Sequence, residues 1–203
     1  MNDQLGELLF RVFNDPRPDI PPDAAYLFGQ TVDNQESSFD AAARSAALEL
    51  LILDTQPRSG YPGYAAWRAE LVAGGYNGNR IQAVPMDDDL LLNSRTESIA
   101  AIDYSMKQGL TSLEVIAPPF HLPRAFMTMI TIALERGADI ALHSHAGKAF
   151  SWNETATHSQ GELEATRAGL IHTELERIAT YQAKGDLAAT ADILDYLNTR
   201  RTA

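Results

Sequence analysis

The sequence contains no cysteine, and this absence excludes several kinds of chemistry. A chain without cysteine forms no disulfide, holds no metal or iron–sulfur cluster through thiolates and has no cysteine nucleophile. Positive charge is scarce as well, because 16 lysines and arginines stand against 27 aspartates and glutamates, for a formal net charge of −11. This excess of negative charge repels nucleic acid and anionic lipid surfaces, so we expect neither as a partner.

Long apolar runs and a basic leader segment are also missing. No stretch approaches the roughly 18 consecutive apolar residues that a membrane span requires, so we expect a cytoplasmic protein without a membrane partner. The sequence has no G-x-x-x-x-G-K-[ST] phosphate loop and no G-x-S-x-G nucleophile elbow. These absences exclude P-loop ATPases and α/β-hydrolases.

What the sequence does contain is an alternation of short apolar runs and amphipathic segments. Its 203 residues, 45% of them hydrophobic, predict one compact domain. The apolar runs predict buried strands at residues 24–28, 48–53, 80–84, 112–117 and 140–142. The run 48–53 also fits a continuation of the preceding helix, although we favour a strand. Because parallel strands are joined by long right-handed crossovers, the alternation predicts an α/β fold, a three-layer Rossmann-like domain with a mainly parallel sheet.

Helical periodicity fills the intervals between these strands and both ends of the chain. Helices are predicted at residues 3–13, 38–47, 64–73, 98–108, 120–136, 162–184 and 187–201. Ser38 is the expected N-cap of the second helix, and residues 146–161 have the polar composition of a loop. The single domain then has three parts: an N-terminal helix with a proline-rich connector (1–23), the Rossmann-like core (24–145), and a loop with the C-terminal helices (146–203).

The richest candidate site is the loop at residues 117–125, because ligands of parallel sheets bind where strand ends lead into helix N-termini. His121 and Arg124 lie three residues apart in it, which places both on one face of the first helical turn. Arg124 can hold a phosphate or carboxylate through two parallel hydrogen bonds, and His121 can donate a proton. The alternative is that Arg124 pairs with a surface carboxylate and His121 only caps a turn.

A second group of polar side chains opens the preceding helix. Asn93 or Ser94 can cap this helix through a side-chain oxygen, with Glu97 as a capping-box partner. Alternatively, the three side chains face the same pocket as His121. Asn93 would then bind the ligand, and Glu97 would bind a ribose hydroxyl or act as a base. The spacing fits both interpretations.

Three further polar features have simpler explanations. Arg44 lies in an alanine-rich helix. Its charge requires either a water-filled cleft or a position on the solvent-exposed face of the helix, and the second is the simpler explanation. His143 and His145 alternate at a strand end without a third ligand, so we predict no metal site there. Asp87 to Asp89 is most simply a solvated acidic loop.

These motifs, in this order, resemble those of the YdcF/SanA/ElyC-like family, bacterial domains with a Rossmann-like α/β fold. The matching residues are Gly29 after the first strand, Arg44 in the next helix, NSRTE at 93–97 and FHLPRA at 120–125. The last of these is the most specific element. The resemblance covers roughly residues 24–145.

The resemblance implies a single cleft with a polar lining. Its lining residues would be Gly29, Gln30, Arg44, Asn93, Ser94, Glu97, His121 and Arg124. It also implies a small, nucleotide-like ligand: one branch of the family suggests S-adenosylmethionine, and an adenine nucleotide is the alternative of the same kind. The chain departs from the family at Gln30, where a second glycine often occurs, and in lacking the frequent membrane anchor.

Two functions fit these residues, and a third interpretation is purely structural: the acidic surface and the closing helices mediate protein association, and the pocket is vestigial. The first is binding of a nucleotide-like or phosphate-bearing small molecule through Arg44, Asn93, His121 and Arg124. The second is a hydrolase or transferase with His121 as general acid or base, Arg124 as stabiliser of negative charge and Glu97 as a further base. The helices that close the chain would cover the pocket or form the interface of a homodimer.

Overall fold

The computed structural model describes residues 3–87, 89–158 and 163–200. Five parallel strands form its central sheet in the order β3-β2-β1-β4-β5. Their bounds are β1 Ala24–Leu27, β2 Glu49–Asp54, β3 Ile81–Pro85, β4 Ser112–Ala117 and β5 Ala141–Ala146. The predicted α/β class is confirmed, and residues 48–53 belong largely to a strand rather than to a continued helix.

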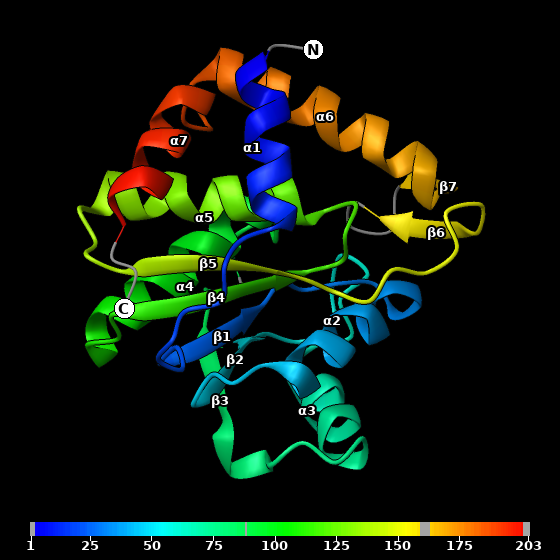
Figure 1. The fold of residues 1–203 in the computed structure, drawn as a ribbon. Coiled ribbons are helices and arrows are strands. Elements are labelled where there is room, and N and C mark those ends of the chain that lie inside the picture. Colours follow the sequence, from blue (N-terminus) through cyan, green and yellow to red (C-terminus); the bar gives the residue numbers. More distant parts are fainter. Residues whose placement is uncertain (1–2, 88, 159–162, 201–203) are drawn as a thin grey trace.

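Helices cover both faces of this sheet, which gives the three layers visible in Figure 1. On one face lie α2 (Val32–Arg44) and α3 (Tyr64–Ala73). The helices on the other face are α1 (Asp3–Phe13), α4 (Ser94–Gln108), α5 (Leu122–Arg136) and α7 (Thr190–Thr199). The long helix α6 (Arg167–Lys184) packs against α5, and a short 3-10 helix, Gly78–Arg80, leads into β3.

Coverage of the sheet on both faces explains why its strands are largely apolar. Tyr26 and Val115 face the layer of α4 and α5, whereas Leu27 and Ile116 face the layer of α2. All four residues of β1 are buried. A strand with both faces covered carries mostly apolar side chains, as β1 does, and Glu114 on β4 and His143 and His145 on β5 are buried polar exceptions.

The order of the strands creates a crevice at one end of the sheet. From β1 the chain proceeds to β2 and β3 on one side, and it later returns to β4 and β5 on the other. The connections therefore diverge between β1 and β4. In parallel sheets this divergence leaves a space outside the carboxyl ends of the strands, where ligands bind.

Helix α2 begins at Val32, well before the expected N-cap at Ser38. Its first turns are polar, so apolar periodicity does not reveal them, yet several of these polar side chains are buried. Asn34 donates a hydrogen bond to the carbonyl of Thr157, and Ser37 donates one to the carbonyl of Lys148. These partners lie far away in the sequence, so long-range contacts help to stabilise this part of the helix.

The polar segment expected to be a loop contains part of a β-hairpin. Its antiparallel strands are β6 (Thr155–His158) and β7 (Leu163–Thr166), seen beside the start of α6 in Figure 1. Residues 159–161 of the predicted loop, residue 162 of the predicted helix and residue 201 lie outside the described part of the chain. The two closing helices are confirmed with later starts, at Arg167 and Thr190, and Gly185 separates them in a left-handed conformation.

The starts of two other helices also differ from the predictions. Helix α4 begins at Ser94 instead of residue 98, which confirms the predicted cap at Asn93 but not the start given by apolar periodicity, and α5 begins at Leu122 instead of residue 120. The first difference follows from the cap at Asn93, which lies ahead of the first apolar residue of the helix. Among the helices that the structure describes, none combines the length and the apolar character needed to cross a membrane.

Candidate functional site

A polar cavity of about 180 Å³ lies at the carboxyl end of the sheet, in the crevice between β1 and β4. The turn after β1, the loop after β2 and the N-terminal turns of α4 and α5 line it, and β6 and α6 contribute further side chains. Its polar lining includes Gln30, Ser94, Glu97, His121, Arg124, His158 and Arg177. We call this space the first cavity.

His121 occupies the N-cap position of α5 and is almost completely buried. Its Nδ1 lies 3.0 Å from the amide nitrogen of Gln30, and its Nε2 lies 3.2 Å from Ser94 Oγ. The Gln30 nitrogen also donates to the carbonyl of Phe28, so this nitrogen is the donor to Nδ1 and the imidazole hydrogen is on Nε2. Burial, reinforced by the charge of Arg124, holds the pKa of His121 well below its usual range, so the ring is neutral.

Arg124 is the central charged group of the cavity. Its Nε donates to Glu174 Oε2 at 2.6 Å, its Nη2 donates to Glu174 Oε1 at 3.2 Å, and its Nη1 donates to Ser94 Oγ at 2.9 Å. A guanidinium that donates along both edges is held in one orientation. Arg124 therefore joins α5, α4 and α6, and its positive charge is fixed beside the cavity.

Glu174, on α6, binds two further groups besides Arg124, one from β6 and one from its own helix. His158 Nε2 lies 3.0 Å from its Oε1, and Arg177 Nη1 lies 3.2 Å from the same atom. Burial alone would raise the pKa of Glu174, but the charge of Arg124 and the hydrogen bond from His158 outweigh this effect and hold it far below its usual range. Glu174 is therefore a carboxylate at neutral pH.

Glu97 is buried below the cavity and holds the turn after β1. Its Oε1 accepts hydrogen bonds from the backbone N–H of Gly29 at 2.5 Å and from the hydroxyl of Tyr26 at 3.0 Å. Burial raises the pKa of Glu97 to about 7, although both hydrogen bonds and the charge of Arg124 act in the opposite direction. Glu97 therefore changes charge close to neutral pH.

Asn93 has the capping role that its sequence allows. Its Oδ1 accepts hydrogen bonds from the backbone N–H groups of Arg95 and Thr96, and Thr96 Oγ1 accepts one from the backbone of Asn93. The partner in this capping box is therefore Thr96, and the expected partner Glu97 is wrong. Ser94, the next residue, instead directs its hydroxyl toward His121 and Arg124.

Arg44 does not reach the cavity, so the expectation that it lines the cleft is wrong. It is the last residue of α2, which starts at the carboxyl end of the sheet and runs toward the opposite end. The side chain is half exposed and pairs with Asp40 at 2.7 Å. The solvated helix face was the correct interpretation.

His143 and His145 also lie elsewhere. Both are buried on β5, and His145 Nδ1 is 3.0 Å from the carboxylate of Glu114. His143 lies two residues before His145 on the same strand, and neither residue lines the first cavity. The alternating pair therefore belongs to the interior of the sheet.

The structure brings most of the predicted residues together and adds three that the sequence reasoning missed. Gly29, Gln30, Asn93, Ser94, Glu97, His121 and Arg124 all line the first cavity. The added residues are His158, Glu174 and Arg177. One signal could have revealed Glu174, because it lies in line with Leu170 and Ile178 on the buried stripe of its helix. A carboxylate on such a stripe requires a buried partner.

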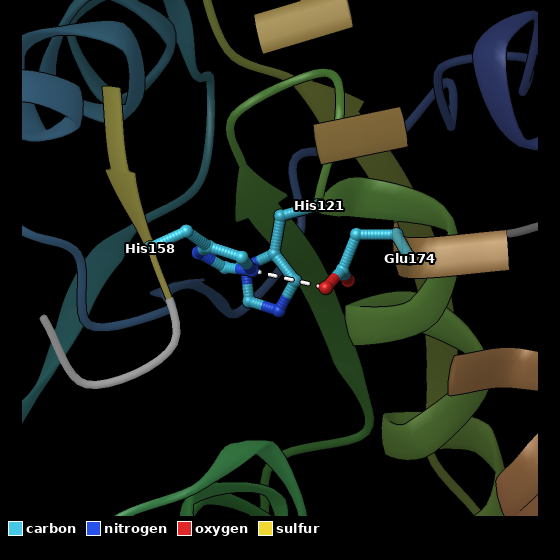
Figure 2. Close-up of side chains that lie close together, drawn as sticks. All are labelled: His121, His158 and Glu174. Atoms are coloured by element: carbon cyan, nitrogen blue, oxygen red, sulfur yellow. Dashed lines mark hydrogen bonds and ion pairs between the residues drawn. The ribbon is translucent and has the colours of Figure 1, made fainter. Parts of the chain in front are cut away.

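Figure 2 shows the side chains of His121, His158 and Glu174 converging from the turn before α5, from β6 and from α6. Each offers a ligand atom within 4.8 Å of the other two, a grouping suited to a metal ion. However, both ring nitrogens of His121 and both oxygens of Glu174 already have protein partners. A cation would have to displace these partners beside two arginines, so the group is better suited to holding Arg124 in place.

The charge of the cleft is opposite to that of the chain. Arg124 and Arg177 both line the first cavity, while Glu174 supplies one firmly ionised carboxylate and Glu97 is only partly ionised at neutral pH. The formal charge of the whole chain is −11. The arrangement therefore favours an anion in the cavity.

A scan of the sequence against protein-family models and a search of curated proteins both find no match. The resemblance to the YdcF/SanA/ElyC-like family stays a prediction that rests on the residues quoted for it.

Proposed function

We propose that this protein binds a phosphate-bearing small molecule in the first cavity. The observation that carries the proposal is the pair Arg124 and Arg177, which face one cavity in a strongly acidic chain. Arg124 is held rigidly by Glu174, so little ordering of this side chain opposes binding. Guanidinium groups bind phosphate oxygens through charge-assisted hydrogen bonds.

Ser94 completes the proposed anion site. Its Oγ accepts hydrogen bonds from His121 Nε2 and Arg124 Nη1, so the hydroxyl hydrogen is available for an oxygen of the ligand. His121 takes part as a neutral donor that polarises Ser94. Gln30 supports it from the other ring nitrogen.

The ligand that we favour is a phosphate ester, and an adenine nucleotide belongs to this class. The rings of Tyr61 and Tyr181 also line the cavity and offer apolar faces beside the charged groups. S-adenosylmethionine, which the family resemblance suggests, carries a carboxylate for the arginines but also a cationic sulfonium. Two arginines beside the cavity disfavour that second charge.

A hydrolase or transferase is the second candidate function. The observation that favours it is the chain of contacts from Gln30 through His121 to Ser94, with Arg124 beside the hydroxyl. In such an enzyme His121 would exchange a proton with the reacting group, Arg124 would stabilise negative charge and Glu97 would be a further proton acceptor. Turnover would distinguish this function from binding alone.

A thermal-shift screen tests the binding proposal. The probes are inorganic phosphate, adenosine monophosphate and S-adenosylmethionine. A ligand present at about 100 times its dissociation constant stabilises the folded protein by about 2.7 kcal/mol, which raises the melting temperature of a chain of this size by roughly 5–10 °C. We expect a shift with the two phosphates and a smaller one with S-adenosylmethionine.

Two variants locate the binding site. Arg177→Ala and Ser94→Ala are each expected to weaken phosphate binding by about tenfold, which corresponds to one charge-assisted hydrogen bond. The matched control is Arg44→Ala, which removes an arginine that is outside the cavity and should leave binding unchanged. Equal loss in the control and the two variants would overturn the site, and release of phosphate from a bound ester would favour the enzyme.

The expected homodimer is a separate prediction. Helix α6 contributes to the cavity and α7 packs on α1 and α5, so both closing helices have a role within one chain. Light scattering coupled to size-exclusion chromatography measures the oligomeric state directly.

A further inference from the structure

A second cavity of about 380 Å³ adjoins the first one. The two share four lining residues, Asn93, Ser94, Arg124 and Tyr181. Leu91, Arg95, Thr128, Asp186 and Leu187 line only the second cavity. The proposed anion site around Ser94 and Arg124 is therefore at the boundary between two spaces.

The size of the first cavity limits what it can hold. Pockets for small-molecule ligands are commonly about 300–1,000 Å³. The first cavity, at about 180 Å³, is below this range, and only the two together reach the middle of it. The first cavity therefore has room for a compact anionic group, and a ligand of ordinary size must extend into the second.

The two cavities differ in charge. Arg95 is the only basic side chain exclusive to the second cavity among the described residues, and its Nη2 binds both oxygens of Glu135 at 2.9 and 2.8 Å. Its Nη1 donates to the backbone carbonyl of Asp186 at 2.8 Å. The second cavity thus adds a neutralised arginine and the exposed carboxylate of Asp186.

Carboxylate, hydroxyl and amide groups beside apolar side chains suit an uncharged, hydroxylated group. The carboxylate of Asp186 accepts hydrogen bonds but repels a second phosphate. Thr128 Oγ1 already donates to the carbonyl of Arg124, so toward a ligand it acts as an acceptor. Sugar hydroxyls are donors that match these acceptors, and Leu91 and Leu187 face the carbon skeleton.

We infer that the ligand is a sugar phosphate, with its phosphate in the first cavity and its hydroxylated ring or chain in the second. This inference rests on the proposed function and names the class of molecule. The phosphate contacts Arg124, Arg177 and Ser94, while the sugar hydroxyls donate to Asp186.

Calorimetric titration with two probes tests the inference. Inorganic phosphate reports on the first cavity alone, and ribose 5-phosphate reports on both. We expect ribose 5-phosphate to bind at least tenfold more tightly than phosphate. In Asp186→Ala this advantage should fall by about tenfold, because one hydrogen bond to a charged acceptor is lost, while the affinity for phosphate is unchanged.

The matched control is Asp19→Ala, which removes an exposed aspartate outside both cavities and should change neither affinity. A second variant, Leu91→Trp, places a large ring at an exposed lining position and should weaken binding of ribose 5-phosphate alone. If phosphate binds but ribose 5-phosphate gains nothing, the second cavity is not a sugar site and this inference is wrong. If neither probe binds, the proposed function itself is wrong.

Discussion

At the scale of single residues, burial sets the protonation states in the cleft. Burial lowers the pKa of His121 and raises that of Glu97 to about 7. At Glu174 the charge of Arg124 outweighs burial, so the pKa of this carboxyl is lowered. Near neutral pH the ring of His121 is uncharged and Glu174 is ionised. The two arginines therefore make the charge that a ligand meets positive, and the ionisation of Glu97 changes the magnitude of that charge.

The raised pKa of Glu97 predicts a dependence of stability on pH. An unfolded glutamate titrates near pH 4.3, so between about pH 4.3 and 7 the folded protein binds more protons than the unfolded chain. The contribution of Glu97 is fully present below about pH 4.3 and is lost, by roughly 4 kcal/mol in all, as the pH rises through 7. Glu97→Gln removes the titrating group and keeps an acceptor for Gly29. The free energy of unfolding of the variant minus that of wild type, measured with urea, should therefore be larger at pH 8 than at pH 5.

The comparison with wild type isolates Glu97 from other titrating groups. His121 acts in the opposite sense, because its lowered pKa makes the folded protein lose stability as the pH falls below about 6.5. Wild type and variant share this effect, so it cancels in the difference. An equal difference at pH 5 and pH 8 would show that Glu97 does not titrate in this range.

Gln30 predicts the tautomer of His121. Because the Gln30 amide donates to Nδ1, the ring nitrogens in NMR spectra should show the hydrogen on Nε2 and no protonation at pH 6. Gln30→Glu places a carboxylate beside Nδ1, which should raise the pKa of His121 and move a hydrogen to Nδ1. Gln56→Glu, at an exposed position, is the control and should leave the His121 signals unchanged. A hydrogen on Nδ1 in wild type would contradict the arrangement.

At the scale of helices and strands, one ion pair attaches α6 to the core. Arg124→Ala leaves the buried carboxylate of Glu174 without its main partner, and we expect a loss of about 3 kcal/mol in the free energy of unfolding. Helix α5 offers a matched control: Arg136→Ala breaks an exposed, solvent-screened pair with Asp103 and should cost far less. Urea denaturation measures both. Equal costs would mean that the Arg124 pair is not buried in solution.

The same scale shows where sequence reasoning succeeds. Strands buried on both faces are short apolar runs, so local composition predicted all five strands of the sheet within a few residues. The start of α2 and the hairpin of β6 and β7 were missed because polar side chains form them. Asn34 and Ser37 have long-range hydrogen-bond partners, which no local pattern contains.

At the scale of the whole molecule, the fold assembles the cleft from segments far apart in the sequence. The FHLPRA segment was enough to predict that His121 and Arg124 lie together in the site, because two residues three apart on one helical turn are close whatever the rest of the chain does. Their partners His158 and Glu174 come from β6 and α6, whose places depend on the complete chain (Figure 1). Arg44 shows how local reasoning fails. It is an arginine in the expected helix, as an anion site would need, but its side chain faces solvent at the opposite end of the sheet.

The contrast between global and local charge predicts an unusual response to salt. At long range a dianionic ligand meets a chain of formal charge −11, so repulsion slows the encounter. Raising the ionic strength from 0.01 to 0.15 M shortens the screening length from about 30 to 8 Å and weakens this repulsion. The contacts with Arg124 are short and largely buried, so salt affects them less. Stopped-flow measurements with ribose 5-phosphate should therefore show an association rate that rises with salt made of weakly binding ions. A rate that falls would mean that positive charge around the cavity, rather than the charge of the whole chain, controls the approach of the ligand.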